Sequence, residues 1–183
     1  MDNLTIRTAT RDDYTRILEL ESENYVENVP DDLRKHGFLS AKMSEAQLDE
    51  IARDLGVVVA YEGDTFHGFF CISRLEHWPP GSVVERLVEA LTVNYQDQRV
   101  ADPQNFCVFG PMCLAPTTRG KGVLQKLYEY AVAILDRRIP TGVGFISVQN
   151  PRSLGAMAKL DWQPMGQFTW GEREYHAMIR DIA

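Results

Sequence analysis

Cysteine is scarce in this sequence. Cys71, Cys107 and Cys113 are the only three among 183 residues; each lies in an apolar stretch, and none belongs to a C-x-x-C pair. Three such residues do not make the disulfide framework of a small secreted domain or a zinc site of paired cysteines. We therefore expect three buried thiols in a reducing compartment.

A secretory leader and a long apolar run are also lacking. The first ten residues, MDNLTIRTAT, have no charged start, apolar middle or small-residue cleavage site. No apolar run approaches the roughly 20 residues that a membrane-spanning helix needs. These absences predict a cytoplasmic protein without a membrane partner.

Positive charge is in the minority, with 19 Lys and Arg against 26 Asp and Glu and a formal net charge of -7. This balance opposes the binding of polyanions through a broad basic surface, so we expect no nucleic-acid partner. His36, His67 and His176 do not have the spacing of metal ligands. The sequence therefore predicts no metal site.

What the sequence does contain fits one domain spanning residues 1–183. The chain is 44% hydrophobic, which is enough for a substantial core, and no repeat, low-complexity tract or linker divides it. The expected order is a strand, helices, a β-hairpin, a helix, and then β-α-β-α-β-β. This order predicts an α/β fold, with a mixed sheet and helices on both faces.

The first half of the chain gives clear local signals. Alternation over residues 4–10 predicts a strand, and apolar spacing over 14–20 predicts a helix. The β-rich runs 57–62 and 66–73, separated by a short turn, predict a hairpin. Ser82, three residues before Glu85, predicts a helix that begins with a capping box.

The second half is organised around an apolar run at residues 106–116. Gly110 and Pro111 interrupt this run, so we expect a central strand with a bulge. The inner stripe from Val123 to Leu135 predicts a helix over 122–138. The elements expected after Pro140 are a strand at 144–149, a helix at 153–160 and strands at 163–170 and 173–179.

The stretch PTTRGKGVLQ, residues 116–125, joins that strand to that helix. The first turn of a helix presents unpaired backbone N–H groups and the positive end of the helix dipole. Gly120 and Gly122 allow a ligand to approach the backbone, and Arg119 and Lys121 add positive charge. No Asp or Glu stands in the first turn to compete, so the pattern predicts an anion site.

Two nucleotide-binding motifs do not fit this stretch. A P-loop needs Ser or Thr after Gly-Lys and a glycine five positions before the second one, but Gly122 follows Lys121 and Ala115 stands at the earlier position. A dinucleotide fingerprint needs glycine at position 125, which is Gln125, and it normally opens the first βα unit of a domain. Both alternatives are excluded.

The segment MCLAPTTRGKGVLQKLYEYA resembles the acetyl-CoA motif of the GCN5-related N-acetyltransferases, the GNAT superfamily. Arg119 and Gly122 match the first two fixed positions of that motif, and Gly120 also fits, whereas Leu124 replaces a small third residue. Three further segments resemble the family in order: LTIRTATRDDYTRILEL, VVVAYEGDTFHGFFCIS and VQNPRSLGAMAKLDWQPMG. In the last, Asn150 matches, but Asp161 replaces the glycine before the aromatic residue.

The resemblance implies a GNAT-like fold whose mostly antiparallel sheet has a bulged and splayed fourth strand. It also implies acetyl-CoA as co-substrate, held along that strand and by the turn that wraps its pyrophosphate. The implied CoA-binding residues are Met112, Cys113, Leu114, Arg119, Gly120, Lys121, Gly122, Val123, Leu124 and Asn150.

The implied chemistry is direct attack of a neutral amine on the thioester. A base removes the ammonium proton, a backbone N–H stabilises the oxyanion, and an acid protonates the leaving thiolate. Where the family usually has a tyrosine that acts as the general acid, this sequence has Met157. The strand from Asn105 to Ala115, where many relatives have the base, contains no acidic residue. The substitute catalytic candidates are Glu21, Glu23, Tyr25 and Glu76, with His77 beside the last.

These observations predict an acyltransferase that moves an acetyl group from acetyl-CoA to the amine of a small molecule. The segment from Glu76 to Gln104 could wall the acceptor pocket. One alternative is a module that binds CoA or acyl-CoA with little or no transfer, which Met157 favours. Another is a protein-interaction module with an unused cleft. Whether the chain forms a homodimer stays open.

Overall fold

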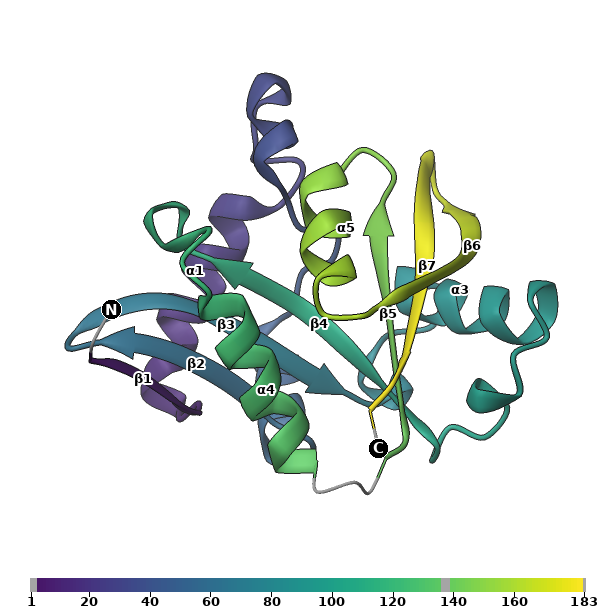
Figure 1. The fold of residues 1–183 in the computed structure, drawn as a ribbon, viewed down its shortest axis with the longest axis horizontal. Helices are drawn as coiled ribbons and strands as arrows, with labels where there is room; N and C mark the ends of the chain where they lie inside the picture. The colour runs from purple at the N-terminus through teal and green to yellow at the C-terminus, as the bar shows by residue number, and fades with distance from the viewer. Residues whose placement is uncertain (1–2, 136–138, 183) are drawn as a thin grey trace.

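The computed structural model describes residues 3–135 and 139–182. One sheet contains seven strands in the order β1-β2-β3-β4-β5-β7-β6 (Figure 1). All neighbouring pairs are antiparallel except β4 and β5, which are parallel. The strands are β1 (Leu4–Thr8), β2 (Val57–Glu62), β3 (Thr65–Ser73), β4 (Phe106–Leu114), β5 (Thr141–Ser147), β6 (Gln163–Trp170) and β7 (Arg173–Asp181).

Helices cover both faces of this sheet, as the sequence predicts. Within the described residues the α-helices are α1 (Tyr14–Asn24), α2 (Glu45–Arg53), α3 (Val83–Glu89), α4 (Val123–Leu135) and α5 (Pro151–Ala158). Helices α1, α2 and α3 bury apolar side chains in one core cluster, and α4 and α5 bury theirs in a second cluster on the opposite face. None of the described helices is long and apolar enough to cross a membrane.

Local signals explain most of the helix starts. The Ser82 hydroxyl accepts a hydrogen bond from the Glu85 backbone N–H, which confirms Ser82 as the N-cap of α3. The Glu85 carboxylate accepts the Gly81 N–H instead of the Ser82 N–H, so the reciprocal bond of the predicted capping box goes to the preceding residue. Helix α5 begins at Pro151 rather than at residue 153, because the Asn150 side chain accepts a hydrogen bond from the Ser153 N–H. Of the helix predicted over 122–138, residues 136–138 lie outside the described part.

The strand predictions hold, with shifted ends. β5 begins three residues before the predicted 144–149 and ends at Ser147, because antiparallel pairing with β7 extends from Thr141 to Ser147. β7 likewise continues to Asp181, which pairs with Thr141. The ladder between neighbouring strands therefore sets these ends, and the alternation of side chains does not.

The predicted bulge and splay are both present in β4. Phe109 pairs with Ile72 and Met112 pairs with Phe70, so Gly110 and Pro111 together oppose a single β3 residue. β4 and β5 pair only over Phe106–Val108 and Thr141–Val143. Beyond these positions the two strands diverge (Figure 1). Part of the β4 backbone therefore has no neighbouring strand on its β5 side.

Candidate cofactor and acceptor site

A cavity of about 610 Å³ occupies the gap between the diverging strands. It extends from one face of the sheet to the other, because both core clusters contribute to its lining. Cys113 and Phe145 belong to or pack against the cluster under α1 and α2, while Phe109 and Met157 belong to the cluster under α4 and α5. The cavity is therefore a slot through the sheet.

The glycine turn forms one mouth of this slot. Gly120 and Gly122 have φ values of 82° and 77°, which glycine adopts without steric cost. A Cβ atom at either position would meet nothing within 4 Å, so open space lies over the turn. Helix α4 starts directly afterwards at Val123 and has no acidic residue in its first turn. Its first backbone N–H groups are thus available to an anion.

Nine of the ten predicted CoA-binding residues line the cavity. Lys121 is the exception: it is exposed and is not part of the lining. Leu124, whose bulk replaces a small residue of the family motif, is half-buried and packs against the core cluster under α4. The nine are Met112, Cys113, Leu114, Arg119, Gly120, Gly122, Val123, Leu124 and Asn150.

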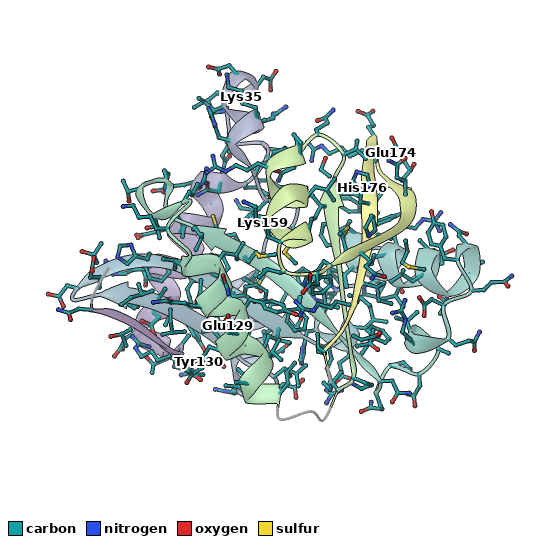
Figure 2. All side chains as sticks on the ribbon, in the orientation of Figure 1. Lys35, Glu129, Tyr130, Lys159, Glu174 and His176 are labelled. Carbon is teal, nitrogen blue, oxygen red and sulfur yellow. The ribbon has the colours of Figure 1, made fainter. Side chains whose placement is uncertain are left out.

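The charge of the lining is opposite in sign to that of the chain. Among the described residues that line the cavity, Arg119, Arg152 and Lys159 carry positive charge and none is Asp or Glu. Lys159 follows the C-terminal end of α5 (Figure 2). The chain as a whole has a formal net charge of -7. This local inversion favours an anionic ligand over a cationic one.

Arg119 does more than supply charge, because its guanidinium joins three segments. It donates hydrogen bonds to the backbone oxygens of Leu114 (3.3 Å) and His36 (2.9 Å), and to the Asn24 side-chain oxygen (2.7 Å). Asn24 ends α1, and His36 ends the short 3-10 helix Asp31–His36, the projection that carries Lys35 in Figure 2. Arg119 therefore ties the glycine turn to the chain between α1 and α2.

Asn150 makes a second tie to the same segment. Its amide nitrogen donates a hydrogen bond to the Phe38 backbone oxygen (3.1 Å), while its oxygen caps α5. The side chain is buried, so both of its polar ends are used inside the protein. Residues 36–41, which line the slot, are thus held from the β4–α4 turn and from the start of α5. Sequence reasoning did not foresee this wall.

Comparison with known proteins gives a result only at the level of structure. No protein-family model matches the sequence, and no curated protein matches it. An N-acetyltransferase from Staphylococcus aureus Mu50 has a TM-score of 0.69 at 15% identity, over 99% of both chains. A GNAT-family acetyltransferase from Streptococcus pneumoniae has a TM-score of 0.66 at 14% identity, over 98% of this chain and 99% of that one. The chain has the GNAT fold.

A third structure with the GNAT fold contains a ligand. This protein, yncA of Salmonella typhimurium, is assigned as an acetyltransferase and was solved with its cofactor acetyl-CoA. It has a TM-score of 0.66 at 16% identity, over 99% of this chain and 95% of that one. At such identities the likeness establishes the shared GNAT fold.

Met157 bears on the proton donor that the described lining of the slot could offer to the leaving thiolate. Met157 is buried and lines the slot, where the resemblance implies a tyrosine. No tyrosine is among the described lining residues. The Cys113 thiol lines the slot, and burial raises its pKa to about 12, so it stays protonated at neutral pH. No phenol in the described lining takes the place of the missing one.

None of the four predicted catalytic candidates lines the slot. Glu23 and Tyr25 flank the lining residue Asn24, and Tyr25 forms a β-bridge with the lining residue Leu39, whereas Glu21 is the buried candidate. Glu21 is 1% exposed and accepts hydrogen bonds from the Met43 N–H at 3.1 and 3.2 Å. Burial raises its pKa to about 7, although the Met43 hydrogen bond and Lys42 oppose the shift. Met43 is two residues beyond Ala41, a lining residue. Glu21 can therefore change protonation state near neutral pH.

The remaining candidates are more exposed than Glu21. Glu23 and Glu76 are exposed, and Tyr25 is half-buried. Glu76 gathers with Asp54 and His77, but the His77 ring accepts a hydrogen bond from the Arg74 N–H and lies 3.6 Å from Asp54, so these side chains stabilise a surface turn.

The segment from Glu76 to Gln104 contributes only Trp78 to the described lining. The expectation that this whole segment walls the acceptor pocket is therefore wrong. Helix α3 within it packs instead against β5 and β6. Its apolar residues Val83, Val84 and Leu87 are buried in the core cluster beneath the sheet, so they are not available to a ligand.

Proposed function

We propose that this protein is an acetyl-CoA-dependent N-acetyltransferase of the GNAT superfamily, acting on the amine of a small molecule. The observation that carries the proposal is the slot itself. It joins a glycine turn at a helix start to a splayed strand, and its described lining has three cations and no carboxylate. A CoA thioester matches these features of the slot, because it has phosphates at one end and an uncharged arm and acyl group at the other.

The residues of the chain would divide the binding of acetyl-CoA between them. The N–H groups at the start of α4 and the turn at Gly120 and Gly122 would hold the pyrophosphate. Backbone groups of Met112 and Leu114, beyond the point where β5 diverges, would pair with the pantetheine arm like an added strand. Arg119 and Asn150 would act indirectly, since both hold residues 36–41.

The reaction then needs two proton transfers and stabilisation of the oxyanion from the chain. The neutral amine attacks the thioester carbon, a C–N bond forms, the C–S bond breaks, and the products are an amide and free CoA. A backbone N–H of β4 beyond the bulge would stabilise the oxyanion. Of the four predicted candidates we favour Glu21, through water, as acceptor of the ammonium proton. Water would supply the proton for the leaving thiolate, since no tyrosine is among the described lining residues.

The decisive experiment measures release of the CoA thiol from acetyl-CoA across a panel of primary amines. Turnover with at least one amine supports transfer. Binding of CoA without turnover of any amine would favour the alternative, a CoA-binding module. The observation that supports this alternative is Met157, which lines the slot where the resemblance implies a tyrosine that acts as the general acid. Absence of both binding and turnover would contradict the proposal.

A matched pair of variants tests the phosphate assignment. Gly122→Asp places a carboxylate at the glycine turn, and we expect it to weaken CoA binding at least tenfold. Gly171→Asp is the control: Gly171 also has a positive φ (59°) and open space around it, but it lies in the turn between β6 and β7 and does not line the cavity. Calorimetric titration with CoA measures both. Equal affinities in the two variants would refute the assignment.

A further inference from the structure

The part of the slot on the sheet face under α1, α2 and α3 has a distinct chemical character. Ser40 lines the slot here as a polar residue. Five apolar lining residues form what we call the acceptor pocket: Leu39, Ala41, Trp78, Cys113 and Phe145. All belong to, or pack against, the core cluster under α1, α2 and α3. Val123 and Leu124, at the glycine turn, pack in the cluster on the other face. A thioester that enters at the turn and passes through the sheet would therefore present its acyl group to this pocket.

The aromatic walls of the acceptor pocket have no free polar edge. The Trp78 indole N–H donates a hydrogen bond to the Ser73 hydroxyl at 2.9 Å, so the polar atom of this side chain is already satisfied. Phe145 is held edge-on against Tyr175, with ring centroids 5.5 Å apart. A bound group would meet the carbon surfaces of these rings, the methyl of Ala41 and the side chain of Leu39. This surface fits an apolar group.

The described lining of the slot offers no carboxylate that would pair with a second positive charge. The described lining contains no Asp or Glu. Glu21 lies outside the lining and is 1% exposed, so it would exchange a proton with the slot only through water and would not form an ion pair with a second ammonium group. An ammonium group buried without a partner carries a large desolvation cost, whereas a ring or a branched alkyl group gains from burial. Arg152 and Lys159, exposed residues of the same lining, would additionally repel a polycation from the slot.

We propose that the acceptor is a small monoamine carried on an aromatic or branched alkyl group, and that polyamines and aminosugars are poor acceptors. This inference rests on the proposed acetyl transfer and deepens it. The reacting amine is the only polar group that the acceptor needs, and it loses its proton before attack. Its apolar body lies against Trp78, Phe145 and Leu39.

Turnover with matched amines tests this acceptor class. 3-Methylbutylamine and 1,4-diaminobutane are of similar size, but the second has an extra charge; 2-phenylethylamine and spermidine extend each type. We expect kcat/KM to be at least tenfold higher for each apolar amine than for its charged counterpart. Equal or higher kcat/KM for the diamine would overturn the inference while leaving acetyl transfer intact.

A binding measurement separates failure of the inference from failure of the proposed function. Protein saturated with CoA is titrated calorimetrically with N-acetyl-2-phenylethylamine and with N-acetylputrescine. Tighter binding of the first compound supports the apolar pocket even when no amine is turned over, in which case the transferase proposal alone fails. Equal affinities, tighter binding of the charged compound, or no binding of either overturns the inference.

A charge introduced into the pocket provides the test at residue level. Ala41 is half-buried and lines the slot. Ala41→Asp should shift the ratio of kcat/KM for 1,4-diaminobutane over 3-methylbutylamine at least tenfold toward the diamine, relative to Ala41→Asn, which has nearly the same size without the charge. Thermal unfolding confirms that both variants fold. The same ratio in the two folded variants would show that Ala41 does not face the acceptor.

Discussion

At the scale of single residues, Arg119 shows the difference between a motif and a geometry. The motif predicts a cation beside a phosphate, but each of the three nitrogens of its guanidinium donates to a protein oxygen, on Leu114, His36 or Asn24. Charge-assisted hydrogen bonds of this kind contribute more than neutral ones. The structure therefore makes Arg119 a positioning residue that connects the glycine turn to the chain after α1.

Loss of this connection should be measurable as stability. We expect Arg119→Ala to lower the free energy of unfolding by about 1–3 kcal/mol, because three protein acceptors lose their donor. Lys121→Ala, two positions away at an exposed side chain outside the lining, should change it by less than about 0.5 kcal/mol. Urea unfolding of both variants measures the difference. Similar values would mean that the three hydrogen bonds of Arg119 contribute no net stability.

Glu21 leads to a prediction about pH. Burial raises its pKa to about 7 in the folded protein, against a reference value of 4.5. The stability that comes from the neutral carboxyl is present below about pH 4.5 and is lost as the pH rises through about 7. Glu21→Gln keeps a neutral side chain at every pH. Between pH 5 and pH 8 the variant should therefore gain about 2–3 kcal/mol of unfolding free energy relative to the parent.

Denaturant unfolding at the two pH values measures this gain, with Glu23→Gln, a change at an exposed carboxylate of the same helix, as control. A pH-independent difference between Glu21→Gln and the parent would show that Glu21 titrates normally in the folded protein. Activity gives a second readout: the rate should show an inflection near pH 7 in the parent that Glu21→Gln lacks, in addition to the rise that deprotonation of the amine causes in both proteins.

The sequence predicts the part of the candidate site that is formed by a local turn and a helix start. It does not predict the part where side chains from distant segments meet. Gly120, Gly122 and the start of α4 follow from local chemistry alone, since a turn and a helix start are local structures. Trp78 and residues 36–41 could not be placed, because no local pattern says that they would reach the slot. The hydrogen bond from Arg119 to His36 spans 83 positions of the chain.

At the scale of elements, the β6–β7 hairpin is joined to the α3 region by close contact. The Tyr95 hydroxyl donates a hydrogen bond to the Gln167 backbone oxygen at 2.6 Å, and the Trp170 indole N–H donates one to the Gly81 oxygen at 2.8 Å. A Cβ atom on Gly166 would collide with the Tyr95 ring. Glycine at this position therefore permits the hairpin to approach the chain that follows α3.

A substitution at this contact should be costly. We expect Gly166→Ala to destabilise the protein by about 1–3 kcal/mol, because an extra methyl in a packed contact forces a shift of neighbouring atoms. Gly155→Ala, inside α5 with no atom within 4 Å of the added methyl, should instead stabilise it by about 0.5–1 kcal/mol. Thermal unfolding monitored by circular dichroism distinguishes the signs. A neutral Gly166→Ala would mean that Tyr95 moves aside without cost.

Element identity proves more predictable than element ends. The hairpin of β2 and β3 and the capped start of α3 follow from patterns within a few residues. The start of β5 does not, because pairing with β7 extends it to Thr141. The bulge in β4 was foreseen from Gly110 and Pro111, since neither residue suits a regular inner strand. How far β4 separates from β5 depends on partners that are remote in the sequence.

At the scale of the whole molecule, a ligand in the slot should stabilise the fold. It would contact β4, the turn before α4, α5 and residues 36–41 together, all of which line one cavity. A ligand that binds only the native state adds RT ln(1 + [L]/Kd), about 2.7 kcal/mol at one hundred times Kd. For a chain of this length we expect acetyl-CoA to raise the melting temperature by roughly 5–10 °C at that saturation.

Differential scanning fluorimetry with acetyl-CoA, CoA and pantetheine, the arm of CoA without its phosphates, measures this effect. The cations of the lining predict that both phosphate-bearing ligands shift the melting temperature, that pantetheine does so less, and that added salt reduces the difference. No shift with acetyl-CoA at millimolar concentration, together with a silent titration, would refute its binding.

The short pairing between β4 and β5 also makes this the position at which the sheet has least resistance to an applied force. Three paired positions connect the sheet half β1–β4 to the half β5–β7–β6. A force pulling the two halves apart would load these few ladder positions, whereas the β5–β7 pairing distributes load over seven. A molecule bridging the slot would share that load, so single-molecule pulling across this position should find the unliganded protein compliant and the liganded protein stiff.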